Sequence, residues 1–144
     1  MPLEVLLVDD SPGDVRLMQE VCRECSNAVH LHVASNGPEA LAFLRREGGH
    51  VSAPRPALIL LDLHLPKLNG REVLAHIKTD DALKTIPTVI LTTSEAEADI
   101  EIAYQIRADC YLRKPVQSDA LDRVVSSIND FWLTRAKLPL TVIG

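Results

Sequence analysis

The chain has 144 residues, of which 47% are hydrophobic, and its formal net charge at pH 7 is −5. This length fits one compact domain, and this share of apolar residues is enough for a buried core, which excludes wholesale disorder. The negative charge argues against nonspecific nucleic-acid binding, which needs a cationic surface, and no apolar run approaches the roughly 20 residues that span a bilayer.

Five short apolar runs bounded by turn-forming residues predict five β-strands. In chain order they cover residues 3–9, 30–34, 57–62, 87–92 and 110–113. The run LILL within the third strand does not alternate apolar and polar residues. Both faces of such a strand must therefore be covered, as in a parallel sheet that lies between helices.

Five helical stretches separate or follow these strands. They cover residues 12–25, 38 to about 48, 70–78, 95–106 and 118–135, and the segment 48–56 reads as a loop. The first helix opens on Pro12, a residue suited to a first helical position. Strand and helix alternate five times, which predicts a right-handed doubly wound α/β sandwich with ligand sites beyond the carboxyl ends of the strands.

Three acids follow two of the predicted strands. Asp9 and Asp10 end the first strand, and Asp62 ends the third. Parallel strands end at the same edge, so the three carboxylates are expected to converge and to repel one another. A divalent cation removes that repulsion, and a site rich in oxygen ligands suits Mg²⁺. The alternative is that each acid merely caps the helix that follows it.

A hydroxyl and a lysine follow the last two strands. Thr92 is placed to donate to an anion, and Lys114 supplies a compact positive charge for phosphate. A cis peptide before Pro115 would aim the lysine inward, and the sequence leaves that isomer open. Because no Ser–His or Cys–His nucleophile pair is evident, a carboxylate that accepts a phosphoryl group fits these parts.

The cysteines and two nearby histidines offer a weaker pattern. Cys22 and Cys25 form a CxxC pair, His30 and His32 follow, and Cys110 is the third cysteine. A zinc site from the first four residues is disfavoured, because the cysteines fall on a predicted helix and structural zinc sites usually join two separated pairs. Half-buried, reduced thiols in a cytoplasmic protein are the better interpretation.

Four motifs together give the chain a recognisable family. The segments VDDSPGD at 8–14, LLDLHLPKLNG at 60–70, LTTS at 91–94 and YLRKP at 111–115 stand in family order and spacing. On these motifs the chain resembles the receiver domain of two-component response regulators over about residues 3 to 130. The resemblance implies a flavodoxin-like (βα)5 fold with a five-stranded parallel sheet in the order 2-1-3-4-5.

The resemblance also implies roles for the acids. Asp62 matches the phosphoacceptor. Asp10 would bind Mg²⁺ directly, and Asp9 mainly through water. His64 would offer its backbone carbonyl to the metal, and its side chain, unusual at that position, puts the lifetime of the acyl phosphate in doubt.

Further residues match the switch of this family. Thr92 and Lys114 would contact phosphoryl oxygens, and Tyr111 would turn inward when Thr92 is drawn to the phosphate. Pro66 and Gly70 match the turn after the third strand. The chain departs from the family pattern at position 107, where an arginine stands in a turn that often holds glycine.

A narrower resemblance concerns the partners. The long loop before the third strand, the segment ADCYLRKP and the ending FWLTRAKLP look like the small response regulators paired with cyanobacterial and bacterial phytochromes. This implies that the phosphoryl donor is a sensor histidine kinase that detects light. Output is expected through protein contact or through onward relay of the phosphoryl group, and not through DNA.

The C-terminal region predicts a second copy of the chain as a partner. Residues 1–135 are assigned to the receiver domain, and 136–144 form an apolar tail. Phe131, Trp132 and Leu133 are consecutive and lie past the usual end of the fold. Apolar surface of this size often marks a partner site, so a homodimer is expected through the predicted helix 95–106, the strand 110–113, the last helix and this extension.

Two other functions use the same residues. A Mg²⁺-dependent phosphatase of the haloacid-dehalogenase type also has an aspartate nucleophile, but it needs a second acid where this chain has His64. A receiver-like scaffold that is never phosphorylated is the other alternative, and the complete set of acids, hydroxyl and lysine argues against it. The expected protein is therefore a phosphoacceptor without a separate substrate to turn over.

Overall fold

The computed structural model describes residues 3–26, 28–63, 65, 67–92, 110–114, 116–134 and 141–143. At positions 92, 110, 111, 113, 127–134 and 141–143 it describes the backbone alone. The helix predicted over 95–106 and the position of Arg107 lie outside the described residues.

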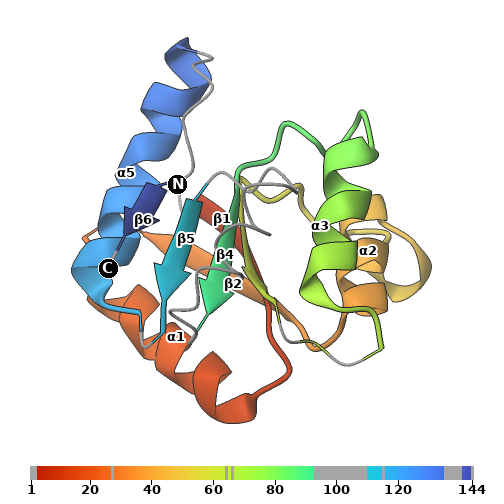
Figure 1. The fold of residues 1–144 in the computed structure, drawn as a ribbon, viewed down its shortest axis with the longest axis horizontal. Helices are drawn as coiled ribbons and strands as arrows, with labels where there is room; N and C mark the ends of the chain where they lie inside the picture. The colour runs from red at the N-terminus through yellow and green to blue at the C-terminus, as the bar shows by residue number, and fades with distance from the viewer. Residues whose placement is uncertain are drawn as a thin grey trace.

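One parallel sheet forms the centre of the molecule, and its strands follow the order β2-β1-β3-β4-β5-β6 (Figure 1). The strands are β1 (Leu3–Val8), β2 (Val29–Ala34), β3 (Leu58–Asp62), β4 (Thr88–Thr92), β5 (Cys110–Arg113) and β6 (Thr141–Ile143). The first five confirm the predicted order 2-1-3-4-5.

The sixth strand was not predicted. It lies in the apolar tail and pairs with β5 in parallel, Cys110 opposite Thr141. The predicted sheet of five strands is therefore one strand short. Three residues are too few to show the alternation or the long apolar run from which a strand is predicted.

The central strands are buried on both faces. Residues 5–8 of β1 and 58–61 of β3 are at most 1% exposed. This confirms the expectation that the non-alternating run of β3 needs cover on two sides.

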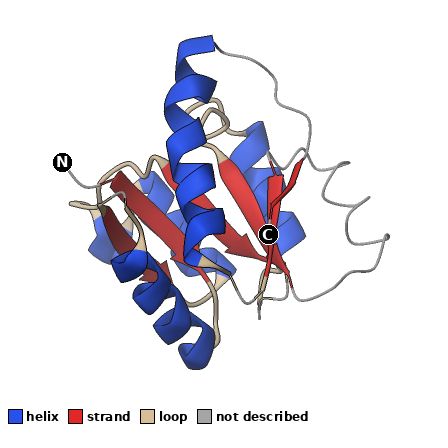
Figure 2. Cartoon of the chain, turned by 90° about the vertical axis from the view of Figure 1, so that its left-hand side faces the viewer, coloured by secondary structure: helices blue, strands red, loops and turns tan. Residues whose placement is uncertain are grey.

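Helices cover the sheet in two layers (Figure 2). They are α1 (Pro12–Glu24), α2 (Gly37–Arg45), the 3₁₀ turn η1 (Gly48–His50), α3 (Gly70–Thr79) and α5 (Ser118–Thr134). Helix α1 packs on α5, and α2 packs on α3. Within the described part of the chain, none of these helices is long and apolar enough to cross a membrane.

Side-chain caps begin the helices that position the site. The Ser11 hydroxyl accepts from the backbone N–H of Asp14 at the start of α1. Asn69 and Glu72 form a capping box at the start of α3, in which each side chain accepts from the backbone of the other. These bonds satisfy N–H groups that have no partner inside a helix.

Helix α2 ends earlier than predicted. The sequence predicts an end at Gly48-Gly49, whereas α2 stops at Arg45 and Arg46 adopts the left-handed conformation with φ 55°. The N–H of Arg46 donates to the carbonyl of Phe43, and that of Glu47 donates to Ala42. Paired bonds of this kind close a helix and here outweigh the preference of the left-handed region for glycine.

Candidate functional site

The first acid of the site is fixed by the end of β1. The backbone N–H of Asp9 donates to the carbonyl of Ala34 and so extends the ladder with β2. Its Oδ1 accepts from the N–H of Ser11 at 2.9 Å. The Asp9 side chain is therefore held at the edge of the sheet, where it is 2% exposed.

Asp62 and Asp10 complete a group of three carboxylates. Asp62 is the last residue of β3 and is 7% exposed, whereas Asp10 is exposed. One carboxylate oxygen from each of Asp9, Asp10 and Asp62 lies within 4.8 Å of the other two. The predicted convergence of the three acids at one sheet edge is therefore observed.

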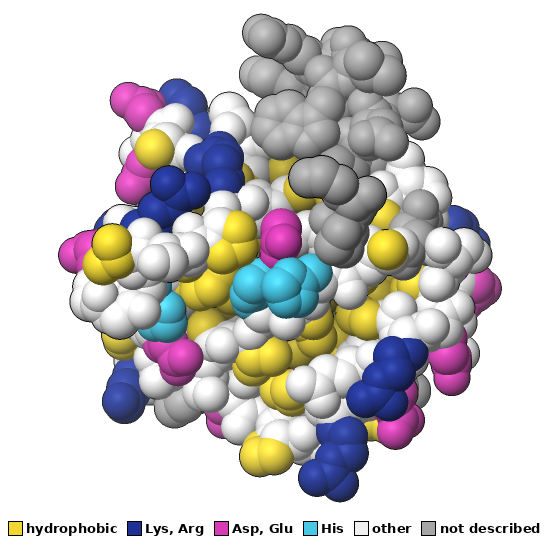
Figure 3. Space-filling model, turned by 180° about the vertical axis from the view of Figure 1, so that it is seen from behind, with side chains coloured by type: hydrophobic (Ala, Val, Ile, Leu, Met, Phe, Trp, Pro, Cys, Tyr) yellow, Lys and Arg dark blue, Asp and Glu magenta, His cyan; other side chains and the backbone are white. Residues whose placement is uncertain are grey.

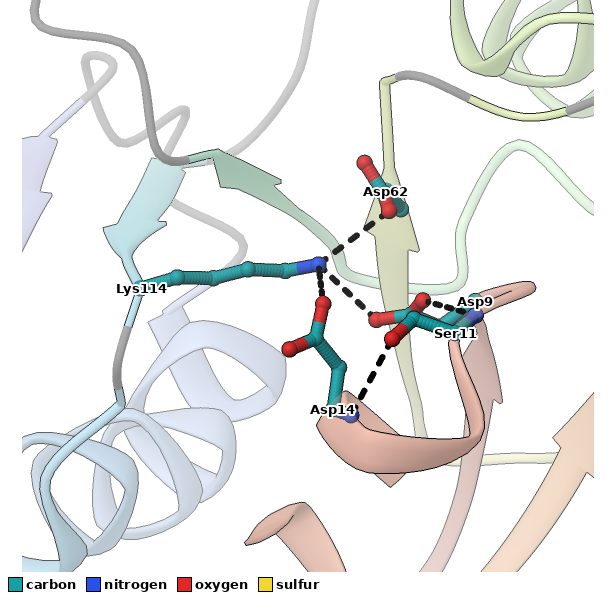
Figure 4. A network of polar contacts seen from close by, with 5 residues as sticks. All are labelled: Asp9, Ser11, Asp14, Asp62 and Lys114. Atoms are coloured by element: carbon teal, nitrogen blue, oxygen red, sulfur yellow. Dashed lines mark hydrogen bonds and ion pairs between the residues drawn. The ribbon is translucent and has the colours of Figure 1, made fainter. Parts of the chain in front are cut away.

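The Lys114 side chain contacts two of these acids, Asp9 and Asp62, and a fourth acid, Asp14 (Figure 4). Its Nζ donates to Asp9 Oδ2 at 2.9 Å, to Asp14 Oδ2 at 2.9 Å and to Asp62 Oδ2 at 3.1 Å. The lysine follows β5, so its chain crosses from that strand to the ends of β1 and β3. The lysine side chain is 12% exposed, which places its charge inside the pocket rather than in solvent.

Burial and charge act against each other in this pocket. Burial raises the pKa of Asp9 above its ordinary value, although the hydrogen bond from Lys114 lowers it in part. Burial also pulls down the pKa of Lys114, but the hydrogen bonds to Asp9 and Asp14 and the charge of Asp62 outweigh that effect and raise it overall. The charged form of Lys114 is therefore favoured, whereas burial disfavours the charged form of Asp9.

A close backbone approach brings α3 to the end of β3. The N–H of Gly70 donates to the carbonyl of Leu63 at 3.0 Å. A Cβ atom at Gly70 would lie 2.3 Å from the carbonyl oxygen of Asp62 and 2.5 Å from Cα of Leu63. Only glycine fits here, so Gly70 lets the helix pack against the strand that carries Asp62.

The donor set fits a divalent cation. Asp9, Asp10, Asp62 and Asp14 bring four carboxylates together, and Lys114 is the cation that the structure pairs with three of them. Oxygen ligands with room for water suit Mg²⁺ and Mn²⁺. The cluster therefore has both the ligands and the unbalanced negative charge that a hard cation requires.

A pocket opens beside this cluster. It has a volume of about 250 Å³ and is lined by both Asp9 and Lys114 and by apolar residues, among them Leu17, Met18 and Val116. Leu17 is 54% exposed. An apolar surface therefore adjoins the acids on the side of α1.

Two features near the site were missed at the level of sequence. Asp14 lies in the first turn of α1, four residues after Asp10, and the motif VDDSPGD contains it without indicating that it reaches Lys114. Lys67 adopts a left-handed conformation with φ 66°, which nothing in the sequence indicates for a lysine.

Several predicted site residues cannot be placed at the level of side chains. His64, Pro66 and Pro115, and with it the isomer of the Lys114–Pro115 bond, lie outside the described residues. At Thr92 and Tyr111, and at Phe131, Trp132 and Leu133, only the backbone is described. In the sheet, Thr92 is the last residue of β4 and lies opposite Arg113 of β5.

Comparison with known proteins finds relatives that match nearly the whole chain. The model of the response regulator receiver domain matches residues 5–126. The response regulator Rcp1 of Synechocystis is 46% identical over 138 residues, which are 96% of this chain and 94% of Rcp1.

Solved structures carry the same resemblance. A phosphorylated cyanobacterial phytochrome response regulator, RcpA, is 44% identical with a TM-score of 0.76, and the match covers 96% of this chain and 99% of that one. The Mn²⁺-bound form of Rcp1 is 46% identical with a TM-score of 0.74 and the same coverage.

Proposed function

The chain belongs to the response regulator receiver family of two-component signalling, and from that premise we propose that Asp62 accepts a phosphoryl group from a histidine kinase. The observation that carries the proposal is the contact of Lys114 Nζ with Asp62 Oδ2 at 3.1 Å within a group of converging acids. A nucleophile, a positive charge and a set of metal ligands thus meet at one point.

The transfer needs little chemistry from the protein. An oxygen of Asp62 attacks phosphorus, the P–N bond of the phosphohistidine breaks, and its electron pair returns to the imidazole nitrogen. Lys114 lies within hydrogen-bond distance of the attacking carboxylate and is placed to pair with a phosphoryl oxygen as the bond forms. Positioning and charge neutralisation of this kind dominate phosphoryl transfer.

Mg²⁺ is the proposed metal. Asp10 and Asp62 would hold it directly, Asp9 through water, and the backbone carbonyl of His64 would add a further ligand. When bound, the cation supplies neutralisation of charge on the phosphoryl oxygens. The structure of Rcp1 with Mn²⁺ supports a divalent metal in this family.

Thr92 and Tyr111 form the proposed switch. Thr92 ends β4, next to β3 and its Asp62, and Tyr111 lies in β5, opposite Ile90 of β4. A phosphoryl group on Asp62 would draw the Thr92 hydroxyl toward it and leave space for Tyr111 to turn inward. Phosphorylation would shift the chain from the resting arrangement of Thr92 and Tyr111 to the active one. The free energy of this shift can be no larger than the difference in phosphate affinity between the two arrangements.

A phytochrome-type sensor kinase is the proposed donor, because the relatives RcpA and Rcp1 resemble this chain over nearly its whole length and RcpA is a phytochrome response regulator. The apolar pocket beside Leu17 is also lined by Asp9 and Lys114, so it offers the kinase a surface to contact next to the acids. Such a kinase domain is cytoplasmic, so we place this receiver there as well.

Incubation with Mg²⁺ and acetyl phosphate, followed by intact mass measurement, tests the proposal. We expect one added phosphoryl group, no label on Asp62→Asn, and full labelling of Asp81→Asn, a matched change at an acid whose side chain is 93% exposed. Labelling that stops at one equivalent supports a phosphoacceptor. Continued turnover of a phosphate ester would instead support the phosphatase, and normal signalling by Asp62→Asn would support the unphosphorylated scaffold.

We also propose a homodimer that uses α5 and the apolar tail at 136–144, with Phe131, Trp132 and Leu133 as its centre. The support is the sequence pattern, in which three consecutive large apolar residues precede an apolar tail. Light scattering at increasing protein concentration should give the mass of a dimer. Trp132→Ser should weaken the dimer at least tenfold, whereas a wild-type chain that stays monomeric at high concentration would refute it.

A further inference from the structure

A second cluster of possible metal ligands lies at the opposite end of β1 from the acids. Glu4 of β1 stands directly opposite His30 of β2 in the parallel ladder, and His32 is two residues further along β2. Residues two apart in a strand project from the same face of a sheet. All three side chains therefore share one face, where Figure 3 shows histidines gathered beside an acidic side chain.

The two imidazoles converge on the carboxylate. His30 Nδ1 lies 3.2 Å from Glu4 Oε1 and 3.1 Å from Oε2, and His32 Nε2 contacts the same Oε2 atom. One ligand atom from each residue lies within 4.8 Å of the other two. Ligands of a tetrahedral zinc ion lie roughly 3.3 Å apart, given bonds of about 2.0–2.1 Å, so small side-chain movements would bring these atoms to zinc distances.

Packing fixes the inner imidazole. The His32 ring lies 4.4 Å from the His30 ring and 5.3 Å from the ring of Phe43 on α2, measured between centroids. Phe43 in turn contacts His50 of η1 edge to face at 5.6 Å. The His32 ring is thus held between neighbours rather than free to rotate, as a metal ligand needs to be.

The exposure of the three side chains leaves one side of the cluster open. The side chain of His32 is 19% exposed, that of Glu4 30% and that of His30 58%. Three protein ligands with a remaining position for water are the arrangement of open zinc sites. A histidine pair with a carboxylate also selects borderline transition metals over Mg²⁺, which prefers oxygen ligands alone.

We propose that Glu4, His30 and His32 form a site for a zinc ion, bound through two imidazole nitrogens and one carboxylate oxygen with water in the fourth position. The site is separate from the acids, because five residues of an extended strand place Glu4 roughly 16 Å from Asp9. Zinc would join β1 to β2, which is the edge strand of the sheet. If zinc binds the folded chain and not the unfolded chain, it raises the free energy of unfolding.

The cysteines do not belong to this site. Cys22 lines a separate hollow with Val29 and Leu31, residues of β2 that alternate with the two histidines and so project from the other face. Burial raises the pKa of the Cys22 and Cys25 thiols to about 11, which disfavours the thiolate form that binds zinc. The third ligand of the proposed site is thus the carboxylate of Glu4, and the CxxC thiols, which the sequence analysis disfavoured as zinc ligands, take no part.

Zinc titration by calorimetry tests the proposal on the full untagged chain. The background carries Cys22→Ser, Cys25→Ser and Cys110→Ser, in excess Mg²⁺, so that neither thiols nor acids compete for zinc. We expect one zinc ion per chain and an affinity at least roughly 100-fold lower in Glu4→Gln, His30→Gln and His32→Gln, since loss of a residue that only supports a metal ligand already costs 10- to 100-fold.

The matched control is His50→Gln, which removes a neighbouring imidazole that is not a ligand and should leave the affinity within a factor of a few. A second measurement does not depend on variants that must fold. The ring nitrogen shifts of His30 and His32 in the wild-type chain should move to metal-bound values at one equivalent of zinc, while those of His76 stay unchanged. Zinc binding that survives His30→Gln with His32→Gln, or ring shifts that do not respond, would overturn the site and leave only a hydrogen-bonded Glu–His pair.

Discussion

Strand β1 carries an acid near each end, and the surroundings shift the two carboxyl pKa values in opposite directions. At the carboxyl end, burial raises the pKa of Asp9. At the other end, the hydrogen bond from His32 lowers the pKa of Glu4, against a weaker effect of desolvation. Asp9 is 2% exposed and shares Lys114 with Asp14 and Asp62, whereas Glu4 has two imidazoles to itself and remains accessible.

The two carboxyl groups therefore change stability in opposite ways as the pH changes. A carboxyl with a raised pKa binds its proton more tightly in the folded chain, so its ionisation costs stability as the pH rises through that pKa. A carboxyl with a lowered pKa contributes stability above its unfolded value, and that contribution is lost as the pH falls through the folded pKa. The negative charge of Asp9 thus lowers the stability of the folded chain, and burial of the apolar core offsets that loss.

The largest expected effect comes from crowding the acid end. In Gly70→Ala the new Cβ would lie 2.3 Å from the Asp62 carbonyl oxygen. We expect the free energy of unfolding to fall by about 3 kcal/mol, because backbone rather than a flexible side chain must move. Urea unfolding measures the loss, and acetyl phosphate labelling should fall with it as Asp62 shifts.

Gly13→Ala is the matched control, because its nearest neighbour would be Ser11 Oγ at 3.9 Å. Alanine is favoured over glycine inside a helix, so this change in α1 should stabilise the chain by about 0.5–1 kcal/mol. Equal effects at the two glycines would contradict the close packing of α3 on β3.

The second effect comes from removing the positive charge. Lys114→Met leaves Asp9 and Asp62 buried without the cation that they share. We expect a loss of about 2 kcal/mol without divalent metal, less than for fully buried pairs because the Asp14 side chain is 41% exposed. Millimolar Mg²⁺ should restore much of this loss, as thermal unfolding with and without the metal would show.

Lys84→Met serves as the control, since Lys84 pairs with the exposed Asp81 and its loss should leave the free energy of unfolding nearly unchanged. A variant at position 114 as stable as this control, with no response to Mg²⁺, would mean that the acids do not depend on the lysine.

The acid end was predictable from sequence because of a simple geometric rule. Parallel strands end at one edge, so Asp9, Asp10, Asp62 and Lys114 could be placed together from strand ends alone. The bond from Lys114 to Asp14 could not be predicted, since it depends on the angle at which α1 leaves the sheet.

The other end of β1 was missed for a different reason. Grouping His30 and His32 with the nearby cysteines followed closeness in sequence, whereas the actual partner is Glu4, 26 residues from His30. That pairing depends on the register between β1 and β2, which no local pattern contains. Similarly, the early end of α2 at Arg45 depends on backbone hydrogen bonds rather than on a glycine.

The third prediction concerns the cost of charge at Asp9. Asp9→Asn keeps an oxygen that can accept from Ser11 but removes a buried negative charge. We expect this variant to be more stable than the wild type at pH 7 without metal, because burial disfavours the charged form of Asp9 in the folded chain. The gain should shrink as the pH falls toward the ordinary value of 3.8, because the folded chain then holds Asp9 in its protonated, neutral form. Urea unfolding between pH 4 and pH 7.5 gives the profile, and a gain independent of pH would exclude burial as the cause.

The smallest effect is expected at Glu4, and its sign decides whether the two ends of β1 truly differ. Glu4→Gln in the presence of EDTA should lower stability at pH 7 by less than about 1 kcal/mol, since the pair is open to solvent. The loss should vanish as the pH falls below the ordinary value of 4.5, because the wild-type carboxylate then takes up its proton and loses its advantage. The same urea series as for Asp9→Asn therefore tests both ends, and the two differences from wild type should have opposite signs at pH 7. If Glu4→Gln also stabilised the chain, the charged carboxylate of Glu4 would destabilise the folded state, as that of Asp9 does. The hydrogen bonds from the two imidazoles would then not stabilise that carboxylate.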